Sequence, residues 1–133
     1  MIYYNNIVII NLSIEIMRIE FYTDRRETCP VRDFLKYDQL SPKDKKKIIN
    51  FLMKVENYED DRLTGFFHSK NATAIKGRNH LYEFRPFPCR IFFTLYGNVC
   101  WLLHIIVKKR SGPAPKKEII KADLRKEEIM NKY

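Results

Sequence analysis

The sequence lacks the features that identify several common protein classes. No apolar run approaches the roughly 18 residues that a membrane-spanning helix needs, so no membrane association is expected. The chain has three cysteines without paired spacing, which argues against a disulfide framework and a zinc site. Its first residues carry neither the basic n-region nor the small-residue cleavage site of a secretory signal. The expected location is therefore the cytoplasm.

Common enzyme motifs are missing as well. There is no P-loop, no dinucleotide-binding fingerprint, no G-x-S-x-G and no H-E-x-x-H. The histidines His68, His80 and His104 are scattered, and residues 76–133 hold only five acidic side chains. A two-metal nuclease would need several carboxylates close together. The sequence therefore predicts no metal site and no cofactor.

Positive charge is abundant and unevenly placed. The chain has 25 Lys and Arg against 16 Asp and Glu, a formal charge of +9. Residues 1–75 hold 12 basic and 11 acidic side chains, whereas residues 76–133 hold 13 basic and five acidic ones, a net charge of +8. Concentrated positive charge is typical of phosphate-binding surfaces, so nucleic acid is the favoured partner. The alternatives to nucleic acid are a basic surface that binds nothing specific and an acidic protein partner.

The N-terminal half has mainly helical patterns. Arg18–Tyr22 alternates as a half-buried strand does. Pro30 suits the first turn of a short helix, and Ser41-Pro42-Lys43-Asp44 predicts the start of a longer one that ends near Tyr58. Two antiparallel helices packed together are therefore expected. The stretch from Arg62 to Lys70 is expected to be irregular.

The C-terminal half has mainly strand patterns. Apolar and β-branched runs predict three or four antiparallel strands, over residues 72–76, 81–87, 89–96 and 99–108. The last of these is apolar on both faces and should be central. Lys116–Lys132 predicts a final helix. The chain is thus expected to be α+β, a small antiparallel sheet with two N-terminal helices packed on it and a C-terminal helix.

The first sixteen residues are interpreted as an extension or arm, with the main domain over residues 17–133. This division rests on Met17, which directly precedes the first alternating strand and is the hypothesised functional start. The alternative is that Ile7–Ile16 adds an edge strand to the sheet.

Charged residues within the predicted strands are informative because half of a strand's positions face the core. A meander would place four of them on one open face of the sheet: Arg85, Arg90, His104 and Lys108. Strict alternation along the last strand puts Cys100 and Leu102 on the face of His104, and Trp101 and Leu103 on the opposite one.

Purely structural roles are the alternatives for these charged residues. Glu83 and Arg85 could form an ordinary ion pair on a solvated face. His104 could be a core histidine satisfied by backbone groups. Lys108 and Lys109 could protect the end of a strand against edge pairing.

Seven short motifs follow one another in the C-terminal half: Lys76-Gly77, Leu81–Arg85, Arg90–Phe93, Gly97-Asn98, Leu103-His104, Val107–Lys109 and Pro115–Ile119. In the order and spacing of these motifs, the C-terminal half resembles the phage-derived, HigB-like branch of the RelE/ParE toxin superfamily. The turn Pro86-Phe87-Pro88 and the segment Arg110-Ser111-Gly112 depart from the family pattern.

This resemblance implies a compact sheet with helices on one face and a toxin held in check by a helix-turn-helix antitoxin. HigB-like toxins are messenger-RNA endonucleases that usually act on the translating ribosome. ParE-like toxins share the fold and poison DNA gyrase instead, and fold resemblance does not choose between the two. A basic phage accessory protein with neither activity is a third possibility.

Metal-independent RNA cleavage would need groups that bind phosphate and move protons. Arg85 and Arg90 are the expected phosphate clamps, because the guanidinium fork matches phosphate oxygens. His104 and Lys108 are candidates for proton transfer, and Glu83 is expected to orient Arg85. The expected contacts to RNA phosphates are Lys76, Arg78, Lys109, Lys116 and Lys117.

Overall fold

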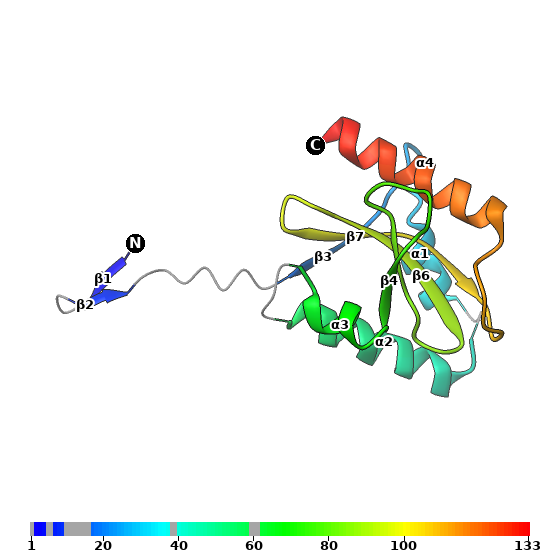
Figure 1. Cartoon of the computed structure of the whole chain (residues 1–133), viewed down its shortest axis with the longest axis horizontal. Coiled ribbons are helices and arrows are strands. Elements are labelled where there is room, and N and C mark those ends of the chain that lie inside the picture. The colour runs from blue at the N-terminus through cyan, green and yellow to red at the C-terminus, as the bar shows by residue number, and fades with distance from the viewer. Residues whose placement is uncertain (1, 5–6, 10–16, 38–39, 59–61) are drawn as a thin grey trace.

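A computed structural model of the chain describes residues 17–37, 40–58 and 62–133, together with the backbone of two short strands near the N-terminus (Figure 1). These strands, β1 (Ile2–Tyr4) and β2 (Ile7–Ile9), pair with each other in a sheet of their own. The rest of the strand expected over Ile7–Ile16 lies outside the described residues. The proposed domain boundary after residue 16 stays a prediction.

Five strands form the main sheet in the order β3-β7-β6-β5-β4. Their bounds are Arg18–Phe21 for β3, Ala72–Ala74 for β4, Tyr82–Phe84 for β5, Cys89–Tyr96 for β6 and Val99–Val107 for β7. Strands β4 to β7 form an antiparallel meander, as expected. The sheet as a whole is mixed, because β3 runs parallel to β7 and so gives the apolar strand β7 a neighbour on each side. The α+β class is confirmed, and so is the prediction that this apolar strand lies inside the sheet and not at its edge.

Three helices cover one face of this sheet: α1 (Pro30–Lys36), α2 (Pro42–Glu56) and α3 (Thr64–His68). The expected start of α2 is confirmed, since Ser41 Oγ accepts a hydrogen bond from the Asp44 backbone N–H at 3.2 Å. Helix α3 was not expected from the sequence. It has only five residues, and Phe66 holds it to the core through edge-to-face contacts with Tyr58 and Phe84.

Helix α4 (Lys116–Lys132) covers the opposite face (Figure 1). The expectation that the helices would pack on one face only is therefore wrong. The apolar stripe of α4 includes Ala122 and Ile129, which join Phe92 and Leu103 of the sheet in a second core cluster. Covering both faces buries apolar side chains of β6 and β7 that would otherwise meet water.

An irregularity in β7 changes which side chains face α4. Phe92 pairs with His104 but Phe93 pairs with Leu102, so Leu103 is an extra residue on β7. As a result the side chains of Leu103 and His104 both face α4, while Cys100 and Leu102 belong to the core under α1 and α2. The strict alternation expected along β7 is therefore wrong on the N-terminal side of His104.

Candidate functional site

A carboxylate held by two arginines lies where β5 and β6 adjoin the turn between them. Arg85 contacts Glu83 Oε1 through Nε at 2.9 Å and through Nη2 at 2.8 Å. Arg90 Nη1 donates to the same oxygen at 3.2 Å. Glu83 lies in β5 and Arg85 directly follows that strand, two residues on, and the pairing of β5 with β6 brings Arg90 beside them. We call Glu83, Arg85 and Arg90 the arginine cluster.

The members of the arginine cluster differ in exposure. The side chains of Glu83 and Arg90 are 2% and 6% exposed, whereas that of Arg85 is 41% exposed. Glu83 Oε2 is buried without a hydrogen-bond partner in the described part of the chain. Arg85 is therefore the member that a molecule in solution can reach, and buried Glu83 and Arg90 lie beneath it.

A loop rich in cations adjoins the arginine cluster. Arg90 Nη2 donates to the Arg110 carbonyl oxygen at 3.3 Å, and the Lys108 backbone N–H donates to the Pro88 carbonyl oxygen at 2.9 Å. These bonds hold Lys108 against the turn after β5 and Arg110 against Arg90. We call residues 108–117 the basic loop, which includes the first two residues of α4. Its cations are Lys108, Lys109, Arg110, Lys116 and Lys117.

The acidic side chains of residues 76–133 all have internal partners. Glu83 binds Arg85 and Arg90, Glu118 binds His104, Asp123 binds Arg78 and Lys126, Glu127 binds Lys126, and Glu128 accepts from Tyr22. The five cations of the basic loop, by contrast, have no carboxylate within ion-pair distance in the part of the chain that the structure describes. Part of the +8 charge of residues 76–133, namely that of the five basic-loop cations, is therefore not neutralised by a carboxylate of the described residues beside the arginine cluster.

His104 lies on the same sheet face but has partners of its own on α4. Its Nε2 is hydrogen-bonded to Glu118, and its Nδ1 lies 3.1 Å from Arg125 Nη1. A guanidinium only donates, so Nδ1 accepts and Nε2–H donates to the Glu118 carboxylate. The same Arg125 nitrogen donates to the Leu103 carbonyl oxygen at 2.9 Å. Backbone groups were the expected hydrogen-bond partners of His104, but its two ring nitrogens bind the side chains of Glu118 and Arg125.

Burial lowers the pKa of His104, as does Arg125, although the hydrogen bond to Glu118 acts in the opposite direction. The pKa of Glu118 is lowered mainly by its bond to His104. Burial also lowers the pKa of Arg125. These directions fit a neutral imidazole held between a carboxylate and a guanidinium.

The remaining expected phosphate contacts lie elsewhere. Lys76 and Arg78 belong to the turn between β4 and β5, and Arg78 forms an ion pair with Asp123 of α4 at 2.9 Å. The structure therefore brings together Glu83, Arg85, Arg90 and the basic loop, while His104 and Arg78 bind α4.

Several residues of these networks were not found from the sequence. Arg110 had been noted only as a departure from a family pattern, yet its carbonyl oxygen connects the basic loop to Arg90. Glu118 and Arg125 are seven residues apart, a spacing that places both on one helix face, but nothing local shows that this face meets His104.

A family model supports the resemblance found in the sequence. The model for phage-derived protein Gp49-like (DUF891) matches residues 36–127, about two thirds of the chain. This chain belongs to the Gp49-like family. The family is phage-derived and toxin-like, is related to RelE and HigB, and is of the type II toxin–antitoxin kind. A search of curated proteins found no match. The matched segment contains the arginine cluster, the basic loop and the His104 network.

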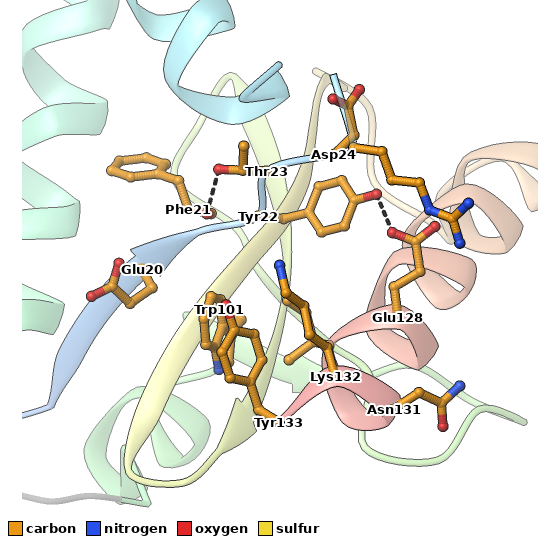
Figure 2. Close-up of a pocket in the computed structure, with 12 residues that line it drawn as sticks. Glu20, Phe21, Tyr22, Thr23, Asp24, Trp101, Glu128, Asn131, Lys132 and Tyr133 are labelled. Carbon is orange, nitrogen blue, oxygen red and sulfur yellow. Dashed lines mark hydrogen bonds between the residues drawn. The ribbon is translucent and has the colours of Figure 1, made fainter. Parts of the chain in front are cut away.

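The Gp49-like chain also has a pocket of about 560 Å³ at the C-terminal end of α4 (Figure 2). Trp101 and Tyr133 stack there with ring centroids 5.1 Å apart. Tyr22 donates to Glu128, and burial together with this bond raises the pKa of Tyr22 to about 12.

This pocket is a poorer phosphate site than the arginine cluster. Its lining carries the carboxylates of Glu20, Asp24 and Glu128 against only two cations, Arg25 and Lys132. Apart from Trp101, its lining lies outside residues 36–127, the segment that matches the Gp49-like family. We therefore take the arginine cluster with the basic loop as the candidate site.

No helix in the described residues of this Gp49-like chain is long and apolar enough to cross a membrane. Within the same residues, no three His, Cys, Asp or Glu side chains lie close enough to hold a metal ion.

Proposed function

We propose that this Gp49-like chain is the toxin of a type II toxin–antitoxin system and that it cleaves messenger RNA on the ribosome without a metal ion. Its partners would be ribosome-bound messenger RNA and a helix-turn-helix antitoxin, which places it in the cytoplasm. The observation that carries the proposal is the exposed guanidinium of Arg85, held by buried Glu83 beside the basic loop.

The reaction would use the RNA itself as the nucleophile. The 2′-oxygen loses its proton and attacks the adjacent phosphorus, and the bond from phosphorus to the 5′-oxygen of the next nucleotide breaks. The 5′-oxygen takes up a proton as it leaves, so the products are a 2′,3′-cyclic phosphate and a 5′-hydroxyl. The enzyme must stabilise extra negative charge on the phosphate during this step.

Arg85 is the residue best suited to stabilise that charge. Nε and Nη2 are fixed on Glu83 Oε1, and Nη1 has no partner in the described part of the chain. A guanidinium that is already oriented loses less conformational entropy when it binds a phosphate. Lys108 and Lys109 of the basic loop would bind neighbouring phosphates, and Lys108 is retained as the proton-transfer candidate.

Arg90 and His104 receive different roles from those expected. Arg90 is nearly buried and binds both Glu83 and the basic loop, so we assign it to positioning Arg85. Both nitrogens of His104 are occupied by α4 residues, so we assign it to anchoring α4. Lys116 and Lys117 stay with the basic loop as phosphate contacts, and Lys76 and Arg78 are weaker contacts at the far turn.

The decisive experiment compares RNA cleavage with inhibition of DNA gyrase. After induction in cells, messenger RNA is mapped for cuts within codons while plasmid supercoiling is followed. Purified protein is then given ribosome-free RNA with and without EDTA, because ribosomes themselves require magnesium. Cuts that end in a 5′-hydroxyl and persist in EDTA support the proposal. Intact RNA together with lost supercoiling would contradict the proposal and identify the chain as an inhibitor of DNA gyrase.

A matched variant shows whether the arginine cluster carries the activity. Arg18 and Glu20 form the same Arg–Glu pair two residues apart on β3, at 3.3 Å, but both side chains are exposed. Arg85→Ala should abolish growth arrest and RNA cleavage, whereas Arg18→Ala should retain both.

A further inference from the structure

The turn between β5 and β6 presents an aromatic ring to solvent. Phe87 is 54% exposed, although Pro86 and Pro88 on either side are buried. Single exposed apolar side chains are common on protein surfaces, so exposure by itself has no functional meaning. It is the charged groups near this ring that indicate a function.

One cation contacts the Phe87 ring, and two further basic residues belong to or adjoin its turn. The ammonium group of Lys47 on α2 lies 5.3 Å from its ring centroid. Arg85 precedes it by two residues, and the backbone N–H of Lys108 binds the carbonyl oxygen of the adjacent Pro88 at 2.9 Å. Lys47 has no carboxylate within ion-pair distance among the described residues. An exposed aromatic ring beside cations that outnumber the carboxylates is the arrangement that single-stranded nucleic acids bind.

The turn holds the ring in place. The Cys89 N–H donates to the Pro86 carbonyl oxygen at 2.7 Å, and the Arg85 N–H donates to the Asn71 carbonyl oxygen at 3.0 Å. The proline rings restrict the backbone on both sides of Phe87. A ring carried by a restrained backbone loses less entropy when a base stacks on it than a ring on a mobile loop does.

We propose that Phe87 is a stacking platform for one unpaired RNA base whose neighbouring phosphates are bound by Arg85 and the basic loop. This inference rests on the proposed ribonuclease function and adds the substrate class, namely a single strand with its bases accessible. A duplex keeps its bases stacked inside the helix and would not offer one to Phe87. Because every base has a π-face, the platform would tolerate any sequence.

Charge argues for RNA over the apolar side chain of a protein partner. Lys47, Arg85 and Lys108 would each lose hydration beneath an apolar protein surface without gaining an anion. The phosphates on either side of a stacked base supply those anions.

The test uses a fluorescently labelled 2′-O-methyl RNA, which binds but is not cleaved because its 2′-oxygen is blocked. A matched RNA carries abasic positions in place of bases. Phe87→Ala should bind the base-containing RNA about tenfold more weakly than the wild type. It should bind the abasic RNA as the wild type does.

Tyr133 is the matched control. It is 62% exposed with the Lys132 ammonium 5.5 Å from its ring centroid, but it stacks on Trp101 in the pocket with three carboxylates. Trp101 pairs with Thr94, whereas the Phe87 turn precedes Cys89, a separation of roughly 20 Å along the strands. Tyr133→Ala should leave RNA binding unchanged.

A fluorescence probe gives a second readout. Phe87→Trp should show quenching on addition of the base-containing RNA beyond that of the wild type, whose single tryptophan is Trp101. Equal binding by Phe87→Ala and the wild type would overturn the inference while leaving the ribonuclease proposal intact. Binding of a protein partner, but not of RNA, that depends on Phe87 would also overturn it. If the wild type does not bind the base-containing RNA and its induction in cells leaves messenger RNA intact, both proposals fail together.

Discussion

Arg90 donates to a carboxylate oxygen of Glu83 at 3.2 Å from the neighbouring strand, and both side chains are almost completely buried. A buried ion pair is expensive to form, because both charges lose water. Arg90 offsets this cost by also binding the Arg110 carbonyl oxygen. The pair therefore links the sheet to the basic loop.

Removal of Arg90 should destabilise the protein, because Glu83 would keep its buried charge with only exposed Arg85 as partner. We expect Arg90→Ala to lower the free energy of unfolding by about 3 kcal/mol. The control Arg18→Ala removes an exposed pair and should cost less than about 1 kcal/mol. Urea unfolding measures both, and equal losses would show that the buried pair has no special importance.

Replacement of Arg85 by lysine should separate charge from geometry. Lysine keeps the positive charge but cannot hold Glu83 and a phosphate with one planar group. We expect Arg85→Lys to cleave RNA about 10- to 100-fold more slowly, with unfolding unchanged because the side chain is 41% exposed. Cleavage at the wild-type rate would show that charge alone suffices.

The His104 network should make stability depend on pH. Burial lowers the pKa of His104 in the folded protein below its ordinary value of 6.5, so near this pH the unfolded chain binds more protons. Stability should therefore decrease as the pH falls from neutral through 6.5 to the lower folded value. Glu118, whose pKa is also lowered, should add a further loss of stability below its ordinary value of 4.5.

His104→Gln tests this pH dependence, because glutamine can form hydrogen bonds but does not titrate. Urea unfolding of the wild type and the variant is compared at pH 7.5 and pH 5.5. The wild type should lose more stability than the variant over this interval. Parallel losses would mean that His104 is not the titrating group.

Asp123 should be important for holding α4 on the sheet. Its carboxylate lies 2.7 Å from the ammonium of Lys126 and 2.9 Å from the guanidinium of Arg78. Burial opposes ionisation of Asp123, but these two cations lower its pKa overall. Because the Lys126 side chain is only 3% exposed, Asp123→Ala should destabilise the protein by about 3 kcal/mol.

Glu127 is the control for Asp123. It also lies near Lys126, at 3.3 Å, but its side chain is 55% exposed. Glu127→Ala should therefore change the free energy of unfolding by less than about 1 kcal/mol. Thermal unfolding of the two variants side by side measures the difference, and similar effects would contradict the role assigned to Asp123.

Local sequence patterns determined most elements of this protein, with the exception of α3, and the excess of positive charge in its C-terminal half. Ser41 caps α2 as predicted, and α4 spans Lys116–Lys132 as predicted. Gly97 and Asn98 both have positive φ in the turn that joins β6 to β7. The two-residue spacing of Glu83 and Arg85 also predicted that their side chains lie on the same face of the sheet, because side chains alternate along a strand. Such features depend on neighbours a few residues apart.

Only the tertiary structure decided which charged side chains meet. The extra residue Leu103 in β7 offers a carbonyl oxygen to Arg125, and α4 takes both nitrogens of His104. Arg110 reaches Arg90 from 20 residues away through its backbone oxygen. These contacts depend on strand register and helix docking, which the packing of the whole core sets. The sequence therefore located the strongly basic half of the chain, and the fold left Arg85 as the exposed member of the arginine cluster.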